Sequence, residues 1–264
     1  MLRTIPAYLA LATLVVACGG TESDTAPAVE DQTEAAEAVV ADAQDAVATV
    51  ADEAVAAVDA SKGEALFAPC IACHGVNGEG NMALNAPGIA GQSESDLKRQ
   101  LWEFKNGQRG NHEGDTAGAQ MRPMAAALTD RQAIADVSAY IASLPPTVPP
   151  VTIAGDADNG EKLYISKCGA CHGGDAWGNE SLYTPRLTML GDAYVVRQVT
   201  NFQEGMRGTG EETQYGKQMA TMAKIVSAEV LLDIVALLYE LAANQGADLY
   251  GTAGPGTERV GTRR

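Results

Sequence analysis

Two copies of one short pattern constrain this chain more than any other feature. Residues Cys70–His74 and Cys168–His172 each place two cysteines three positions apart, with a histidine directly after the second. Two thiols on one short turn can each bond to a vinyl group of the same porphyrin, and the histidine can then ligate its iron. A redox-active cysteine pair does not require the histidine, and a zinc site needs four converging ligands.

The pattern therefore predicts two covalently bound haem c groups. The attachment residues and iron-ligating histidines that it names are Cys70, Cys73, Cys168, Cys171, His74 and His172.

The two patterns lie within a longer internal repeat. Cys168 stands 98 residues after Cys70, and the same offset, applied without a gap, aligns identical residues over a long stretch. The aligned pairs include Gly80 and Gly178, Pro87 and Pro185, Gln100 and Gln198, Phe104 and Phe202, Arg109 and Arg207, and Met121 and Met219. The chain thus contains a duplicated module, which we call the first and the second module.

Each module is expected to hold the same helices in the same order. Helices are predicted over residues 61–69 and 159–167, 93–106 and 192–204, and 129–143 and 227–243, with Thr129 and Ser227 as N-caps of the last pair. A glycine-rich loop follows each haem-motif histidine, and a polar loop leads to a pair of methionines. Apolar residues at helical spacing in the last helices are predicted to be core: Ile134, Val137, Tyr140, Ile141, Val230, Ile234, Leu237, Leu238 and Leu241.

This order resembles the class I cytochrome c fold, and the duplication resembles the dihaem cytochromes c of subtype four. The resemblance covers residues 61–243. It implies an all-α protein of two tandem class I cytochrome c domains, each a few helices around a covalent haem c. The expected divisions are a signal peptide (1–17), an acidic Ala-rich tether (18–60), domain 1 (61–144), a Pro-rich linker (145–151), domain 2 (152–243) and a flexible tail (244–264).

A haem with one histidine ligand needs a sixth ligand or keeps an open site. Met121 and Met219 stand where the axial methionine stands in the family that the chain resembles, which implies that they ligate the iron. Met124 and Met222, three residues further on, are interpreted as apolar filler near the haem, with ligation of the iron in place of Met121 and Met219 as the alternative. His112 lies in the polar loop and is interpreted as an exposed residue, with ligation as the alternative.

Other repeated residues suggest how the ligands are supported. Pro87 and Pro185 each lie 13 residues after a ligand histidine, and the resemblance implies that their carbonyl groups accept a hydrogen bond from the imidazole. Stiffening of the loop is the alternative. Four arginines recur in pairs and are predicted either to meet the haem propionates or to be surface charge: Arg99, Arg109, Arg197 and Arg207.

The N-terminus carries the marks of an export signal. A short basic start at Arg3 is followed by the apolar run 5–16, which ends in a stretch that resembles a bacterial lipobox before Cys18. Lipid attachment to Cys18 is the interpretation, and an ordinary secretory signal is the alternative. Either one places the mature protein outside the cytoplasm. The lipid-anchored form predicts a location in the bacterial periplasmic space, at a membrane.

The net charge of −16 argues against binding to nucleic acid, which depends on phosphate neutralisation. Much of that charge lies in the tether, where residues 22–61 contain 11 acidic side chains and no basic one. Ala-rich composition over 34–59 is compatible with a marginal helix. Helical or not, the tether would hold the haem modules away from a membrane.

These features predict an electron-transfer protein that is not an enzyme, with no catalytic residues and no small-molecule substrate. The leading hypothesis is a membrane-tethered dihaem carrier that serves respiratory partners such as a quinol-oxidising complex and a terminal oxidase. An electron-entry subunit of a larger oxidase, dehydrogenase or reaction-centre complex is the alternative. A dihaem peroxidase is the third hypothesis, and it would need one haem with a vacant or weakly held sixth position.

Overall fold

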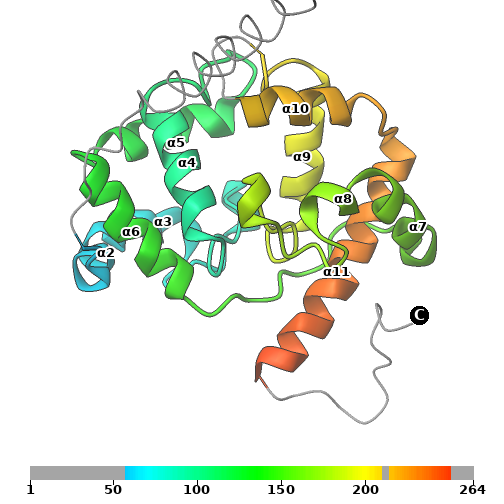
Figure 1. Ribbon diagram of the computed structural model, residues 1–264, viewed down its shortest axis with the longest axis horizontal. Helices are drawn as coiled ribbons and strands as arrows, with labels where there is room; N and C mark the ends of the chain where they lie inside the picture. The colour runs from blue at the N-terminus through cyan, green and yellow to red at the C-terminus, as the bar shows by residue number, and fades with distance from the viewer. Residues whose placement is uncertain (1–56, 210–213, 251–264) are drawn as a thin grey trace, which may run out of the picture. The chain divides into compact units, whose positions relative to one another are not determined.

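The computed structural model describes residues 57–209 and 214–250, and Figure 1 shows these as helices joined by loops. Within these ranges no strand is assigned. Two isolated bridges, Asn81 to Ala86 and Asn179 to Thr184, occupy the same place in the two modules. The all-α fold class is therefore confirmed. Cys18, the predicted leader and most of the predicted tether lie outside the described residues.

The two modules contain matching sets of helices. The first comprises α2 (Ala60–Phe67), α3 (Ile71–His74), α4 (Glu94–Lys105), α5 (Thr116–Ala126) and α6 (Arg131–Ser143). The second comprises α7 (Ala157–Lys167), α8 (Gly169–His172), α9 (Asp192–Gln203), α10 (Gln214–Ala223) and α11 (Ala228–Tyr250). Short 3₁₀ turns occur at Ala68–Cys70, Met82–Leu84 and Glu180–Leu182.

The first and last helices of each module cross at a glycine. A Cβ atom on Gly63 of α2 would overlap the carbonyl oxygen of Asp136 on α6, and α7 meets α11 in the same way. The Asp136 carboxylate also accepts a hydrogen bond from the Asp59 amide at 2.8 Å, which fixes the chain just before α2. Because glycine has no side chain, the two backbones can approach closely, and the crossing sets the angle at which α2 carries the chain into the haem motif.

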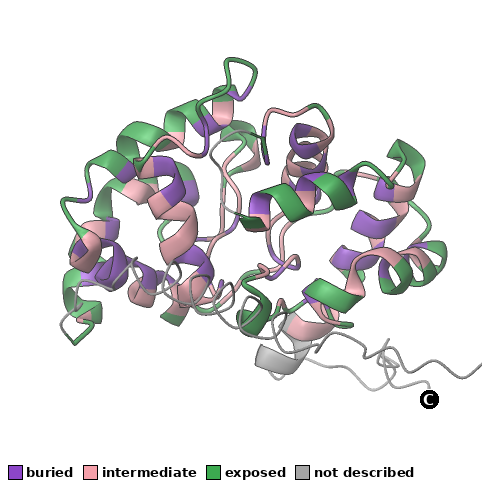
Figure 2. Cartoon of the chain, turned by 45° about the horizontal axis from the view of Figure 1, so that its top comes forward, coloured by how far each residue is buried: buried purple, intermediate pink, exposed green. Residues whose placement is uncertain are grey.

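Apolar side chains fill the space between these helices, and Figure 2 shows the buried segments on the inward faces. Most of the predicted core residues are buried: Ile134, Val137, Ile141, Ile234, Leu237, Leu238 and Leu241. Val230 and Tyr140 pack against the cores as partly buried residues. Phe67 and Tyr164, at equivalent positions on α2 and α7, are almost fully buried. The core predicted from helical periodicity is confirmed.

Two helix boundaries differ from the predictions, and one predicted cap is confirmed. The N-cap of α6 is Asp130 and not Thr129, because the Asp130 carboxylate accepts from the Ala133 amide at 2.8 Å. Ser227 does cap α11, where its hydroxyl accepts from the Val230 amide at 3.3 Å. Helix α11 continues to Tyr250, past the predicted end at residue 243.

The methionine pairs lie on two further helices that were not predicted, after the polar loops that were expected to lead to them. Helix α5 contains Met121 and Met124, and α10 contains their counterparts. The signal for α5 is Asp115, whose side chain accepts from the Gly118 amide at 2.9 Å as the N-cap. Because glycine has a low helix propensity, the glycines in this segment weaken the sequence signal of the helix.

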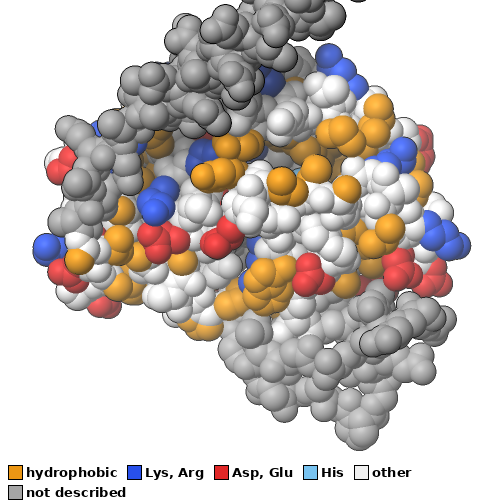
Figure 3. Space-filling model, viewed as in Figure 1, with side chains coloured by type: hydrophobic (Ala, Val, Ile, Leu, Met, Phe, Trp, Pro, Cys, Tyr) orange, Lys and Arg blue, Asp and Glu red, His pale blue; other side chains and the backbone are white. Residues whose placement is uncertain are grey.

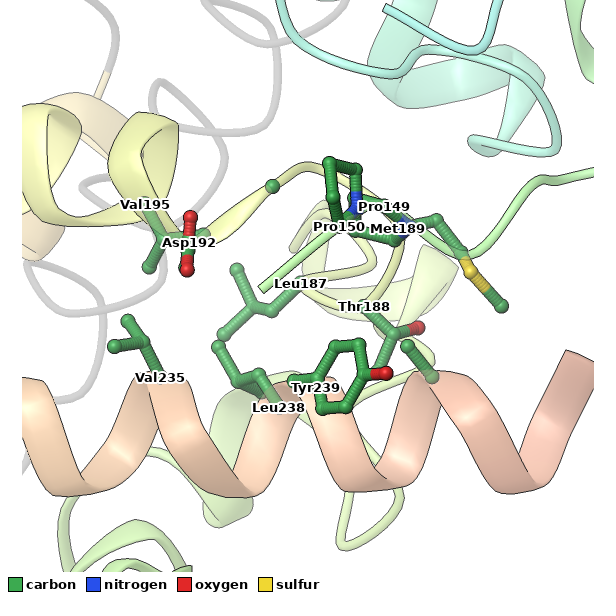
Figure 4. A pocket seen from close by; sticks show the side chains of 12 residues that line it. Pro149, Pro150, Leu187, Thr188, Met189, Asp192, Val195, Val235, Leu238 and Tyr239 are labelled. Carbon is green, nitrogen blue, oxygen red and sulfur yellow. The ribbon is translucent and has the colours of Figure 1, made fainter. Parts of the chain in front are cut away.

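The Pro-rich linker enters the second module at Asp192, the first residue of α9. Its carboxylate accepts from the Thr152 amide at 2.6 Å, the Thr152 hydroxyl at 2.7 Å and the Ile153 amide at 2.7 Å. Figure 4 shows Pro149 and Pro150 above the face of α11 that bears Tyr239. The hydrogen bonds thus attach the chain just after the linker to the start of α9.

Candidate functional site

Each haem-motif histidine is buried and bonded to a proline carbonyl. The His74 Nδ1 atom lies 2.9 Å from the carbonyl oxygen of Pro87, and His172 Nδ1 lies 3.0 Å from that of Pro185. A carbonyl oxygen can only accept, so Nδ1 carries the proton and Nε2 keeps a free lone pair. Burial lowers the pKa of both histidines, although the carbonyl bonds oppose this. Both rings are therefore held in the tautomer that ligates a metal.

The loop after each histidine is folded back so that this bond can form. Gly75 and Gly173 both have φ of +81°, a backbone conformation that glycine adopts without strain. The amide of Gly80 then donates to the His74 carbonyl at 2.7 Å, and Gly178 donates to His172 at 2.9 Å. The part of the loop that returns toward the histidine thus places the proline carbonyl beside the imidazole ring.

The four motif cysteines lie on or next to short helical turns. Cys70 and Cys168 are half-buried, and Cys73 and Cys171 are exposed. Burial raises the pKa of Cys70, and it raises the pKa of Cys168 to about 11. Two thiols and an imidazole with a free Nε2 on one turn fit the attachment of a haem c in each module.

The methionines of each pair differ in exposure. Met121 on α5 and Met219 on α10 are half-buried, and Met219 packs against the core of the second module. Met124 and Met222 are 38% and 39% exposed. The structure brings each histidine to its proline, whereas each methionine pair lies on a separate helix.

Arg109 and Arg207 form a hydrogen-bonded cluster between the modules. Arg109 donates to Gln100, to the Tyr194 hydroxyl at 2.9 Å and to Gln198 Oε1 at 2.9 Å. Arg207 donates to Gln198 at 2.8 Å and to Gln100 at 3.1 Å. Both arginines are less than 8% exposed. Surface charge is therefore the wrong interpretation for this pair.

The other repeated arginines flank this cluster. Arg99 forms ion pairs with Asp96 and with Glu103, and Arg197 donates to the Asn85 carbonyl at 2.7 Å. The Nε atoms of Arg99, Arg109 and Arg197 are buried and have no hydrogen-bond partner among the described residues. Buried donors of this kind suit an anionic group such as a haem propionate.

Sequence reasoning missed Tyr194, which stands where the first module has Asp96. Burial alone would raise the pKa of this phenol, but the guanidinium groups of Arg109 and Arg207 outweigh it and the pKa is lowered. The only signal in the sequence is the break in the repeat, an acid replaced by an aromatic residue on a helix that otherwise matches.

Other potential ligands are scarce in the described part of the chain. His112 lies in an exposed loop, where its Nδ1 accepts from the Gly114 amide at 3.1 Å. Within residues 57–209 and 214–250, no three His, Cys, Asp or Glu side chains cluster as a metal site. The helices described there are also too short or too polar to cross a membrane.

Comparisons with known proteins agree with the two-site geometry. The family described as "Cytochrome c" matches residues 60–145, and "Cytochrome C oxidase, cbb3-type, subunit III" matches residues 155–224. A protein named thiosulfate dehydrogenase electron acceptor, from Thiomonas intermedia, is 34% identical over 150 residues, which are 53% of this chain and 65% of that protein.

Two further relatives span both modules. Cytochrome c4 of Azotobacter vinelandii is 34% identical over 185 residues, which cover 66% of this chain and 86% of the relative. The crystal structure of reduced recombinant cytochrome c4 from Pseudomonas stutzeri superimposes with a TM-score of 0.54 at 31% identity, over 70% of this chain and 98% of that one. With two covalent haem c groups on two class I cytochrome c domains, this chain belongs to the cytochrome c4 family.

Proposed function

We propose that this protein carries single electrons between redox partners, through two haems that each have one histidine and one methionine ligand. The observation that supports this most is that both modules contain a buried, tautomer-fixed histidine and, at the same register of the repeat, a half-buried methionine. Haem c, when bound, supplies an iron that alternates between Fe(III) and Fe(II). One electron enters from a reduced partner and leaves to an oxidised one, and no atom is transferred.

The axial ligands in this proposal are His74 and Met121 in the first module, and His172 and Met219 in the second. Pro87 and Pro185 orient the histidines through their carbonyl groups. The more exposed Met124 and Met222 are not ligands. A filled sixth position on both irons would exclude peroxide, which separates the carrier from a dihaem peroxidase.

Absorption spectroscopy of the purified ferric protein tests the ligand set. Methionine ligation gives a near-infrared charge-transfer band between sulfur and ferric iron, and we expect the amplitude of two such sites. Cyanide added to the untreated protein should bind slowly. Rapid cyanide binding, or a protein without the band, would contradict the proposal and favour the peroxidase.

The domain boundaries stay a prediction: a signal peptide over 1–17, a tether over 18–60 and a Pro-rich linker over 145–151. We propose that lipid on Cys18 anchors the mature protein at a membrane that faces the periplasmic space. Mass spectrometry of the intact protein from its native membrane would reveal an acylated N-terminal cysteine. A Cys18→Ser variant should be released by a salt wash, whereas an anchored protein requires detergent.

The second candidate function is that of an electron-entry subunit that stays bound to one enzyme. It is favoured by the similarity to a thiosulfate dehydrogenase electron acceptor and by the match of the second module to a subunit of a cbb3-type oxidase. The surface in Figure 3 intersperses acidic, basic and apolar side chains, which fits a weak transient contact as well as a stable one. Mild detergent extraction followed by size-exclusion chromatography would distinguish them, because a subunit would elute with its oxidase or dehydrogenase.

A further inference from the structure

One buried arginine distinguishes the second module from the first. Arg186 directly follows Pro185, whose carbonyl accepts the hydrogen bond of His172, and Arg186 is 2% exposed. Gly88 takes its place in the repeat. A Cβ atom on Gly88 would overlap the carbonyl oxygen of Met189, so the first module has no room for a side chain there. The close contact between Gly88 and Met189 of the second module thus prevents the first module from having an arginine at this position.

The neighbours that hold the Arg186 guanidinium are uncharged. Its Nε atom donates to the Thr188 hydroxyl at 2.8 Å, and one Nη atom donates to Gln245 Oε1 at 3.1 Å. The Trp177 ring covers it with a centroid distance of 3.6 Å. Among the described residues, no carboxylate lies within 4 Å of this guanidinium. The positive charge is therefore buried without direct compensation.

Asp175, the acid whose charge acts on Arg186, has a counterpart in the first module. Asp175 accepts from the amide of Trp177, two residues later, at 3.1 Å. In the first module Glu79 accepts from the amide of Asn77, two residues earlier, at 2.8 Å. Both modules thus keep one carboxylate at this turn, but only the second adds a guanidinium. Burial lowers the pKa of Arg186 to about 10, and Asp175 opposes that shift, so the side chain remains charged at neutral pH.

We propose that Arg186 raises the reduction potential of the haem held at His172. Ferric iron carries one more positive charge than ferrous iron. A fixed, buried cation on the residue that follows Pro185, whose carbonyl accepts the ligand's hydrogen bond, therefore disfavours the ferric form. The equivalent position of the first module is Gly88, which carries no charge, so the effect is expected at the second haem. This inference rests on the proposed carrier function. It identifies Arg186 as the residue that favours the reduced state of the second haem.

Redox titration of the purified dihaem protein tests the role of Arg186. In Arg186→Gln, the ferric-to-ferrous ratio of the second haem at a fixed solution potential should rise by about three- to tenfold, where tenfold corresponds to about 59 mV for one electron. Arg186→Lys keeps the charge and should stay within about twofold of the wild type. Lys162→Gln removes an exposed charge from the same module and serves as the matched control.

A second variant leaves the arginine in place. Gln245→Glu is nearly isosteric and puts a carboxylate at the Oε1 position, 3.1 Å from the guanidinium. The ratio at the second haem should again rise, by about threefold, because the new charge compensates the old one. Gln214→Glu, at an exposed position on α10, is its control. This variant decides the matter if Arg186→Gln does not fold.

Proton NMR of haem methyl resonances tells the two sites apart, and Met219→Ala assigns those of the second haem. The near-infrared sulfur-to-iron band is recorded for every variant, so a failure of the ligand assignment is visible separately from a failure of this inference. The inference is overturned if, with the band intact, neither Arg186→Gln nor Gln245→Glu moves the second haem. It is also overturned if Arg186→Lys moves that haem as far as Arg186→Gln does, or if both haems move equally.

Discussion

The carbonyl oxygen of Asp233 on α11 fills the space that a side chain on Gly160 of α7 would occupy. The Asp233 carboxylate meanwhile accepts from the Asp156 amide at 2.9 Å, so backbone and side chain of one residue both hold the start of the second module. Gly63 and Asp136 repeat this arrangement in the first module. The crossing of the first and last helices therefore depends on a position where any side chain is too large.

Replacing Gly160 with Ala tests this crossing. In an ordinary helix interior the change would stabilise the protein by up to about 1 kcal/mol. Here the extra methyl group must separate α7 from α11, and we expect a loss of about 1–3 kcal/mol of unfolding free energy. Denaturant unfolding followed by circular dichroism measures it. Gly174→Ala is the control, since the nearest described atom to its Cβ position, apart from its chain neighbours, is a side-chain carbon of Ile165 at 4.0 Å. Equal stability of both variants would contradict the close approach.

The two methionines of a pair should respond differently to replacement. Met219→Ala should remove about half of the near-infrared band, because one of two haems loses its sulfur ligand. Met222→Ala, which truncates a side chain already 39% exposed, should leave the band unchanged. Met121→Ala and Met124→Ala repeat the comparison in the first module. A band lost with Met222 and kept without Met219 would reverse the ligand assignment.

The hydrogen bonds that the Asp192 carboxylate accepts should make the stability of the second module depend on pH in the acidic range. Its pKa lies below the ordinary 3.8; burial opposes this, but the hydrogen bonds from Thr152, Ile153 and Ala193 prevail. Because the folded pKa is depressed, the stabilisation is fully present above about pH 4 and disappears as the pH falls through the folded value.

Asp192→Asn should cost about 1–3 kcal/mol at neutral pH, since an amide cannot accept all of these bonds. The difference in unfolding free energy between the variant and the wild type should shrink below pH 4. Melting curves recorded from pH 7 down to pH 3 check this. A difference that is independent of pH would show that the carboxylate charge is not what holds the linker.

The bond between Arg109 and Tyr194 should couple the two modules. Tyr194→Phe leaves a buried guanidinium without one of its acceptors, and we expect a loss of about 1–3 kcal/mol. Tyr140→Phe is the control, because the Tyr140 ring packs on Phe67 and no bond of its hydroxyl is present in the described residues. A double-mutant cycle with Arg109→Met isolates the pair, and additive losses would rule out the coupling.

Much of the fold was accessible from the sequence because the repeat supplies each observation twice. The ligand histidines, the spacing of Pro87 and Pro185, and the core of α6 and α11 all follow from local patterns. The periodicity of Ile134, Val137 and Ile141 indicates a buried helical face irrespective of the partner.

The contacts between modules were not accessible in this way. Nothing local to Arg109 indicates that it reaches Tyr194, which lies 85 residues further along the chain. The buried position of Arg186 depends on Gln245 and Trp177, two residues that the repeat does not conserve. Helix α5 was missed because glycine and Pro123 weaken its helical signal, while the Asp115 cap that starts it is a single residue.

The exchange of bonds between Arg109, Gln198, Arg207 and Gln100 has the pattern of an isologous dimer, in which each partner offers the same residues to the other. Two separate copies of one module could meet through this surface, but in such a dimer every substitution would occur twice. A single chain escapes that symmetry. In the repeat, Asp96 aligns with Tyr194 and Gly88 aligns with Arg186. Two identical subunits could not differ in this way. Fusion of the two copies therefore allows the protein environments of the two iron sites to differ.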